Sequence, residues 1–530
     1  MGSKKLQVWL PLLFAIVMTI GMWLGYKLRA DTSSAAVGFV ANTRNNSIQE
    51  ILNLIQNKYV DNVSLDTLKE DAINEMLTHL DPHSVYIPVR ELQEVNEDMQ
   101  GNFMGIGVEF QLYDDTVNIV NVIADGPSYK AGVQIGDKII KVNDTVLIAG
   151  KKIKPDDIKK LLRGPGGSDV NITVLRDRQL QRITIERGLI PLPSVDVAYI
   201  IAPGTGFIHI NKFSETTYKE FMAAMERLQQ QGMNQLILDL RGNGGGLLQE
   251  AANIADEFLD GDKMIVYTEG NKIPRMEYHC RKDGIFEKGK LTVLVDETSA
   301  SAAEILSGAL QDWDRATLIG RRTFGKGLVQ QQYSLTDGAA VRLTVARYYT
   351  PIGRNIQKPY NKGIEEYENE LITRFHNGEL VHADTAKPKG LAYKTNAGHI
   401  VYGGGGITPD IFIPFDTTSQ PKEVLQLYLK GTLNNFVYEY YVQNRAYLRT
   451  FKTPIGLYKQ FKPGEKEWQE LSSFAKKDTI DLSNISTVAK TDMLKRFQSL
   501  LARQIWRAEG YYEISNETDP IVKKALEVLK

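Results

Sequence analysis

Apolar residues repeat at helical spacing in the first hundred residues of the chain. Ile48, Ile51 and Leu52 stand three and four positions apart, and a second run with the same spacing ends just before Pro82. Such spacing gathers apolar side chains on one face of an amphipathic helix. Proline biases the preceding residue away from helical geometry, so we expect the helix to end there. The pattern predicts a helical packing segment over residues 31–100.

Short apolar runs separated by turns replace this pattern over residues 101–190. Gly126 and Pro127 are typical of the residues that separate the runs. The predicted strands cover residues 117–122, 138–142, 170–176 and 181–186, and a predicted helix covers residues 158–163. A segment of about 90 residues with this content is large enough to be one compact domain.

From residue 191 to residue 415 the chain repeats a strand, a loop and a helix. Residues 235–240 and 291–295 are mostly apolar, and a loop and then apolar residues at helical spacing follow each run. Strands without polar alternation are typical of a sheet covered on both faces. Residues 336–339 read Thr-Asp-Gly-Ala, which is a hairpin signal. The region is predicted to be an α/β domain.

Residues 416–530 are polar and helical in pattern. Met493, Phe497 and Leu501 fall on one face of a predicted helix. No residue combination there points to chemistry, so an accessory packing element or a dimer element is predicted.

The apolar run at the start of the chain is long enough to cross a membrane. Residues 6–26 contain no charged side chain, and basic residues flank both ends. About 20 apolar residues at ~1.5 Å each span the ~30 Å hydrocarbon core. A cleaved signal peptide is the alternative, but the run is longer than a usual signal and no clear cleavage site follows it. We therefore predict an uncleaved anchor within residues 1–30.

Composition excludes several classes of function. The 530 residues include 63 Lys and Arg against 64 Asp and Glu, a net charge of −1, so bulk charge does not favour a nucleic-acid partner. The single cysteine, Cys280, allows neither an intrachain disulfide nor a Cys-x-x-Cys zinc site. The seven histidines form no His-Glu-x-x-His motif. No metal or other cofactor is predicted.

Ser301 lies where a predicted strand turns into a predicted helix, in Ser299-Ala300-Ser301-Ala302. The first N–H groups of a helix have no acceptor within it, so a nucleophile here would have donors beside it for a developing oxyanion. The competing interpretation is a helix N-cap, with Glu304 as its capping-box partner. From the local sequence alone, the cap is the better interpretation.

Lys326 stands between two glycines, Gly325 and Gly327. A lysine acts as a general base only when neutral, and burial can bring its pKa from ~10.4 to near 7 at a cost of about 4–5 kcal/mol. The competing interpretation is a solvated lysine in a turn. Gly320 and Gly325-Lys326 also have P-loop spacing, but Gly327 stands where that motif needs Ser or Thr. A nucleotide is therefore not predicted.

The loop Gly244-Gly245-Gly246 follows the strand predicted at residues 235–240. The N–H groups of such a loop can face an anion. Its sequence is not the Gly-x-Gly-x-x-Gly of dinucleotide-binding loops.

Three motifs taken together resemble those of the carboxy-terminal processing peptidases, also called tail-specific proteases. They are Asp239-Leu240-Arg241-Gly242-Asn243-Gly244-Gly245-Gly246, Ser299-Ala300-Ser301-Ala302-Ala303-Glu304-Ile305 and Thr323-Phe324-Gly325-Lys326-Gly327-Leu328-Val329-Gln330. Two further motifs, Leu80-Asp81-Pro82-His83-Ser84 and Gly406-Ile407-Thr408-Pro409-Asp410, are similar to that family as well. The match runs in order from about residue 45 to residue 415, and it reverses the preference for a simple cap at Ser301.

The resemblance implies a serine endopeptidase whose catalytic core, residues 191–415, is a crotonase-like α/β spiral. In this family pattern Ser301 would be the nucleophile and Lys326 the general base, with Gln330 orienting Lys326. The backbone N–H groups of Ala302 and Gly246 would form the oxyanion hole, with the glycine assigned to within one position of the run.

Residues 101–190 resemble a PDZ domain, in which Gly105-Ile106-Gly107-Val108 would bind the carboxylate of a captured tail. The implied partners are polypeptides with free C-terminal tails, and a homodimer is also expected. The implied location is the bacterial inner membrane, with the soluble part in the periplasm. The predicted fold class is multidomain α/β plus PDZ, with an N-terminal transmembrane helix and helical segments at both ends.

Two other functions fit parts of the sequence. A membrane-anchored PDZ scaffold with an inactive peptidase domain would bind tails without cutting them, but Ser301, Lys326 and Gln330 are all present. An acyl-CoA enzyme of the crotonase type would share the core fold. It would give no reason for a PDZ-like domain.

Overall fold

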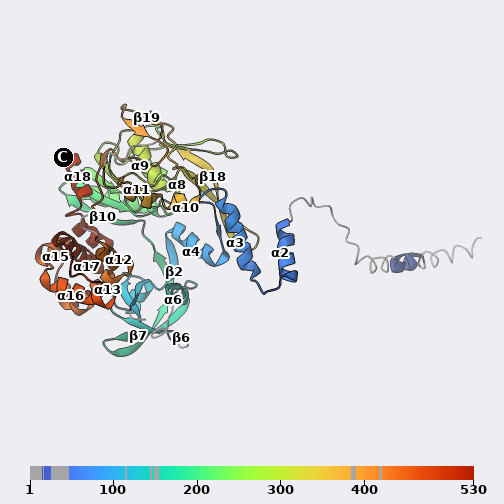
Figure 1. Ribbon diagram of the computed structural model, residues 1–530, viewed down its shortest axis with the longest axis horizontal. Helices are drawn as coiled ribbons and strands as arrows, with labels where there is room; N and C mark the ends of the chain where they lie inside the picture. The colour runs from blue at the N-terminus through green and yellow to red at the C-terminus, as the bar shows by residue number, and fades with distance from the viewer. Residues whose placement is uncertain are drawn as a thin grey trace, which may run out of the picture. The chain divides into compact units, whose positions relative to one another are not determined.

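The computed structural model describes residues 15, 17–24, 47–113, 116–143, 146–147, 154–382, 390–416 and 421–530 (Figure 1). Contacts within the chain divide it into two units, residues 1–73 and residues 74–530. The first unit contains α2 (Ser47–Lys58) and most of α3 (Leu65–Thr78). The active-site residues and the groove discussed below belong to the second unit.

The predicted transmembrane helix is the part of the fold class that the structure overturns. Within residues 6–26 the structure describes residue 15 and residues 17–24, which are helical and exposed, and the rest of that segment lies outside the described residues. Over the described ranges, no helix combines the length and the apolarity needed to cross a membrane. The periplasmic location stays a prediction.

A tight turn and a short strand interrupt the helical pattern before α4 (Val89–Gln100). The Asp81 carboxylate accepts hydrogen bonds from the N–H groups of His83 (2.8 Å) and Ser84 (3.0 Å) and closes the turn. The strand that follows, β1 (Val85–Ile87), pairs with a strand about 250 residues later. No local pattern predicts such a strand, because its partner is so distant in the sequence.

Residues 102–191 form a small antiparallel domain. Its strands are β2 (Asn102–Gly105), β3 (Val108–Tyr113), β4 (Thr116–Val122), β5 (Lys138–Val142), β6 (Val146–Leu147), β7 (Asp169–Arg176), β8 (Gln179–Glu186) and β9 (Gly188–Pro191), and its helices are α5 (Pro127–Lys130) and α6 (Pro155–Leu162). The main sheet has the order β3-β4-β5-β7-β8, with β6 paired to β5, so β3 is an edge strand. Ile139, Ile158 and Ile172 are fully buried in its core. The separate pair β2 and β9 joins the two ends of the domain.

A six-stranded sheet forms the centre of the α/β region. Its order is β10 (Val195–Ala202), β11 (Thr205–Ile210), β12 (Gln235–Asp239), β15 (Lys290–Val295), β16 (Thr317–Gly320) and β21 (Ile411–Phe412). Only β10 with β11 is antiparallel.

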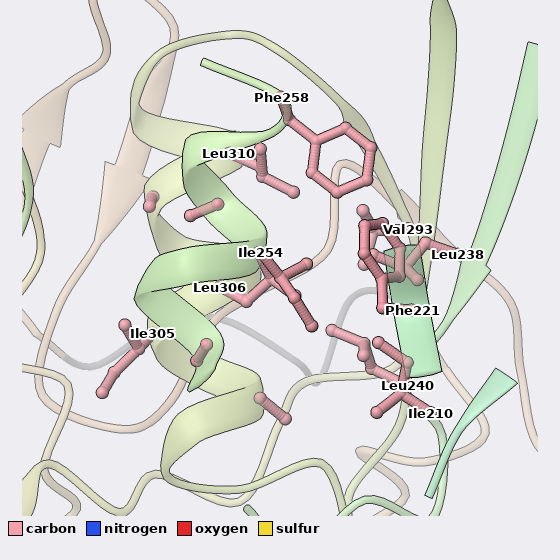
Figure 2. Packing of buried hydrophobic residues seen from close by; sticks show 14 of the residues in the cluster. Ile210, Phe221, Leu238, Leu240, Ile254, Phe258, Val293, Ile305, Leu306 and Leu310 are labelled. Atoms are coloured by element: carbon pink, nitrogen blue, oxygen red, sulfur yellow. The ribbon is translucent and has the colours of Figure 1, made fainter. Parts of the chain in front are cut away.

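The two faces of this sheet are covered by different helices. The covering helices on one face are α7 (Thr217–Gln230), α8 (Leu248–Asp256) and α9 (Ala302–Asp312). Figure 2 shows Ile254, Phe258 and Leu306 directed at the sheet residues Leu238 and Val293. On the other face α18 (Pro520–Leu529) packs Val522 and Ala525 on Ile237 and Leu294. Cover on both faces explains why these strands are apolar without alternation.

A second sheet of the α/β region carries the long hairpin. Its strands are β1, β13 (Met264–Glu269), β14 (Met276–His279), β17 (Leu328–Ser334) and β18 (Ala340–Tyr349). The hairpin β17–β18 turns at residues 335–339, which include the predicted turn at 336–339. The smaller elements of this region are α10 (Ile364–Glu368), α11 (Glu370–His376), β19 (Ala392–Lys394) and β20 (Ile400–Tyr402).

The C-terminal part consists of helices with their own core. They are α12 (Lys422–Leu429), α13 (Thr432–Gln443), α14 (Arg445–Leu448), α15 (Pro454–Gln460), α16 (Glu465–Lys477) and α17 (Thr487–Ser515). Phe497 and Leu501 of α17 are fully buried among the other helices. The helix bends at Trp506 and Arg507, and Arg507 has φ 63° and ψ −148°. The homodimer expected from these helices stays a prediction.

We predict that Asp312→Ala weakens the fold through a buried charge. The Arg354 guanidinium and the Asp312 carboxylate are both fully buried and lie 2.5 Å apart. Removing one partner leaves the other charged group uncompensated, which costs about 3–5 kcal/mol. Urea unfolding followed by tryptophan fluorescence measures the effect. The control is Lys362→Ala, which removes an exposed ion pair with Glu366 and should cost less than about 1 kcal/mol. Equal midpoints for the two variants would contradict the prediction.

Candidate active site

Ser301 is held in an unusual backbone conformation at the start of α9. Its φ is 55° and its ψ is −114°, a region that costs a non-glycine residue about 1–3 kcal/mol. The Ser301 N–H donates to the Glu304 carboxylate at 2.9 Å, as a capping pair would. The Ser301 hydroxyl, however, makes no hydrogen bond with any residue in the described part of the chain. The serine therefore occupies a cap position although its hydroxyl forms no hydrogen bond with the described residues.

The Glu304 carboxylate joins the serine turn to the lysine loop. Its Oε2 accepts the N–H groups of Ser301 (2.9 Å) and Lys326 (2.8 Å). Its Oε1 accepts the Gly325 N–H (2.8 Å) and the Thr323 hydroxyl (2.5 Å). Glu304 is fully buried, and burial raises the pKa of its carboxyl to about 7 although each hydrogen bond opposes that rise. One side chain thus holds the backbone at both Ser301 and Lys326.

Tyr348 of β18 provides a second connection between the same two positions. Its hydroxyl lies 3.1 Å from the Ser301 carbonyl oxygen and also hydrogen-bonds the Lys326 carbonyl oxygen. The ring is almost completely buried. Ser301 and Lys326 are therefore connected through their N–H groups by Glu304 and through their carbonyl groups by Tyr348.

The surroundings of Lys326 favour a neutral amine. Burial is the main cause that lowers the pKa of Lys326, and repulsion from the Arg342 guanidinium lowers it further. The carboxylates of Glu304 and Asp81 act in the opposite direction. Burial, and then the charge of Lys326, lowers the pKa of the neighbouring His83 to about 4. Lys326 Nζ makes no hydrogen bond or ion pair with a described residue, and this includes the Ser301 hydroxyl.

Gln330 belongs to a polar row on one face of the hairpin. Its amide donates to the Thr344 hydroxyl at 3.4 Å, and Thr344 is its cross-strand neighbour. The Thr344 hydroxyl donates in turn to Asp81 at 2.9 Å. Two positions before Thr344 on β18, the Arg342 guanidinium donates a hydrogen bond to the side-chain oxygen of Gln332 at 3.1 Å. Among the described residues Gln330 makes no hydrogen bond to Lys326, so its orienting role stays a prediction.

The glycine loop lies against the serine turn. A Cβ on Gly245 would lie 2.6 Å from Ser301 Cβ and 3.0 Å from Ala302 N. The Ala300 N–H donates to the Asn243 carbonyl oxygen at 2.9 Å, which ties the loop to the turn. The N–H groups of Gly246 and Ala302 donate no hydrogen bond to any acceptor that the structure describes. Both are free to bind an anion, which is what an oxyanion hole needs.

The predicted carboxylate-binding loop is separate from this site and lies beside the edge strand β3. The residues Gly105-Ile106-Gly107 lead directly into β3. Within the described ranges, the N–H groups of Ile106 and Gly107 donate no hydrogen bond. Free N–H groups next to an open strand edge suit a peptide carboxylate.

Several residues near Ser301 and Lys326 were assigned no role from the sequence. Asp81 and His83 belong to a quoted motif, but nothing local shows that this motif reaches Lys326. Thr344 could have been placed opposite Gln330 by counting outward from the predicted hairpin turn. Nothing in the sequence around Arg342 or Tyr348 indicates that these residues lie beside Lys326. No cluster of three or more His, Cys, Asp or Glu side chains in the described ranges is arranged to hold a metal ion.

Comparison with known families and proteins gives consistent results. A model of peptidase family S41 matches residues 204–366, a PDZ model matches residues 119–176, and a model of the activating protease CtpB N-terminal domain matches residues 18–90. Residues 424–507 match a family of unknown function.

Full-length relatives extend the match beyond these segments. A probable CtpA-like serine protease of Staphylococcus haemolyticus is 34% identical over 364 residues, 68% of this chain and 72% of the relative. A carboxy-terminal-processing protease of Bartonella bacilliformis is 35% identical over 319 residues, 58% of this chain and 71% of the relative. The solved photosystem II D1 C-terminal processing protease is 26% identical, with 71% of this chain and 88% of that chain covered and a TM-score of 0.35.

We predict that Gly246→Ala displaces the glycine loop, whereas Gly244→Ala does not. Gly246 has φ +139°, and a Cβ there would lie 2.0 Å from the Phe213 carbonyl oxygen. A Cβ at Gly244 would meet nothing within 4 Å. The forced backbone shift should cost about 1–3 kcal/mol, measured as a lower thermal unfolding midpoint and faster proteolysis within the loop. Identical behaviour of the two variants would contradict the close contact with Phe213.

Proposed function

The chain belongs to the carboxy-terminal-processing proteases, which are serine-type endopeptidases, and we propose that it captures the C-terminal tail of a polypeptide and cleaves it with Ser301 and Lys326. The observation that carries this proposal is the double connection by Glu304 and Tyr348, which fixes the backbone of both residues. The free hydroxyl of Ser301 and the lowered pKa of Lys326 support the same assignment.

The proposed reaction begins with a proton transfer. Neutral Lys326 takes the proton from the Ser301 hydroxyl, and the oxygen attacks the peptide carbonyl carbon. The oxyanion binds the N–H groups of Ala302 and Gly246, which have no competing acceptor among the described residues. Protonated Lys326 then gives its proton to the leaving amine, and water hydrolyses the acyl-enzyme ester.

The first step needs a change of side-chain conformation. Ser301 and Lys326 are not hydrogen-bonded to each other among the described residues, and contacts of this kind are often long before substrate binds. Rotation of the serine side chain breaks no hydrogen bond with any described residue, because its hydroxyl makes none. Gln330 would restrict the lysine once the substrate is bound.

Tail capture would occur at the loop Gly105-Ile106-Gly107-Val108. The carboxylate would accept hydrogen bonds from the free N–H groups of Ile106 and Gly107, and the tail would extend along the open edge of β3. This gives the enzyme polypeptide substrates with a free C-terminus. The tail would then reach the active site as an extended chain.

We predict that Lys326→Ala and Lys326→Arg both lose peptide cleavage but keep tail binding. Alanine has no base, and an arginine side chain does not lose its proton in proteins. The loss should be about 10²–10⁴-fold, the usual contribution of a general base. Mass spectrometry of the released peptides, with Ser301→Ala as the blank, measures cleavage. The control is Lys212→Ala, a lysine paired with Asp98 on the surface. Wild-type turnover by Lys326→Arg would show that Lys326 is not the base.

The pH dependence of cleavage should shift in opposite directions when the charges beside Lys326 are removed. Activity requires the neutral amine, so kcat/KM rises with pH as Lys326 loses its proton. Arg342→Gln removes a repelling cation and raises the pKa of Lys326, which moves the rising limb to higher pH. Asp81→Asn removes an attracting anion and moves the limb to lower pH.

The matched control for this pH experiment is Arg342→Lys. It keeps the positive charge and should leave the limb near its wild-type position. Shifts of the same sign in Arg342→Gln and Asp81→Asn would contradict the assignment of Lys326 as the titrating group.

A further inference from the structure

The open edge of β3 lies beside a large groove. The groove has a volume of about 870 Å³. One wall comes from the loop at Gly105 to Val108, from β3 and from α6, including Leu162 and Arg163. The opposite wall comes from the C-terminal helices, including Val437, Leu500, Arg503 and Gln504. The groove where a tail would bind is therefore lined by two parts of the chain that are more than 250 residues apart in sequence, together with residues 191–193, 195 and 196.

The side chains of β3 alternate between these two parts. Val108, Phe110 and Leu112 pack on the core of the small domain. The residues between them face the C-terminal helices: Glu109 pairs with Arg507 at 3.3 Å, Gln111 hydrogen-bonds Asn435, and the Tyr113 ring stacks on Phe474 at 5.9 Å. A strand added to the edge of β3 would continue this alternation, because successive side chains of a strand point to opposite faces.

The C-terminal wall is attached to the sheet at one further point. The register of β3 and β4 shifts between Glu109 and Phe110, which leaves Val120 of β4 unpaired. The Val120 carbonyl oxygen accepts a hydrogen bond from the Gln504 amide of α17. The next residues along α17 are the bend at Trp506 and Arg507. The bend brings Arg507 against Glu109 at the groove.

Among the residues that the structure describes, the charges around the groove leave one cation without a partner. Lys159 pairs with Asp156, and Arg163 pairs with Glu97. Arg507 pairs with Glu109. The other acid of the lining, Asp196, pairs with His209. Arg503 is exposed to the groove and makes no ion pair or hydrogen bond with a described residue. Its charge is available to a bound tail.

We propose that α17 forms the second wall of the tail-binding groove and that Arg503 selects tails with an acidic side chain facing it. The inference rests on the proposed capture of tails at β3. If the last side chain of the tail enters the apolar side between β3 and α6, the penultimate and fourth-from-last side chains face α17. An acidic residue at either of these positions would meet Arg503, and one at the third-from-last position would meet the apolar side.

The experiment measures peptide binding to the full chain carrying Ser301→Ala, which prevents cleavage. Fluorescein-labelled peptides with an apolar C-terminus carry one Asp at the second, third or fourth position from the end, or none. An amide-capped version of each peptide tests the need for a free carboxylate. We expect Asp at the second or fourth position to tighten binding about two- to fivefold, the range of a partly exposed ion pair, and high salt to remove the gain.

Two variants test the part played by Arg503. Arg503→Gln should remove the gain in affinity from Asp at the second and fourth positions, measured relative to the peptide without Asp on the same variant. The matched control is Lys495→Gln, which removes an exposed cation from the same helix outside the groove lining; it should keep the gain.

The outcomes separate the two proposals. Equal binding of free and amide-capped tails would overturn tail capture itself. Carboxylate-dependent binding with no preference between the Asp positions, or a preference that survives in Arg503→Gln, would overturn the role of α17 and leave tail capture standing.

Discussion

The active site depends on one buried carboxylate. Glu304 has no contact with solvent, and an ionised group in such a place is destabilising by several kcal/mol unless its oxygens are hydrogen-bonded. Four donors meet this need, and they come from the serine turn and from the lysine loop. The carboxylate is satisfied only when the two segments lie together. The same hydrogen bonds that make its burial possible therefore hold the backbone N–H groups of Ser301 and Lys326 on one carboxylate oxygen.

Lys326, the proposed base, illustrates why a lysine needs a protein interior to act as a base. Water keeps an amine charged at neutral pH, and burial together with the Arg342 charge opposes this. The Asp81 carboxylate acts in the opposite direction and raises the pKa of Lys326. It also accepts a hydrogen bond from the Thr344 hydroxyl, which is the hydrogen-bond partner of Gln330. The turn that contains Asp81 comes from the N-terminal helical segment. That segment thus contributes to the electrostatics of the site as well as to packing.

The C-terminal helices connect two functional regions of the molecule. Near its bend, α17 donates a hydrogen bond from Gln504 to β4, a strand of the sheet that borders the groove. Two turns further on, the Tyr512 hydroxyl lies 3.1 Å from His209 Nε2, which lies 3.2 Å from the Arg241 carbonyl oxygen. Asp519, at the start of α18, binds the Arg241 guanidinium at 2.7 Å. Arg241 begins the loop that ends at Gly246. A region without recognisable chemistry in its sequence is thereby in contact with both the groove and the glycine loop.

The sequence by itself determined two strands of the central sheet, β12 and β15, the long hairpin and the family motifs, because each of these depends on local periodicity or on a short ordered pattern. The membrane-spanning helix predicted for the N-terminal apolar run was wrong, because no helix of the described residues is both long and apolar enough to cross a membrane. Only the tertiary structure decided that Arg342, Tyr348 and Asp81 surround Lys326, and that α17 borders the groove beside β3. These contacts join residues tens to hundreds of positions apart, and their energy comes from burial and pairing that exist only after the chain has folded.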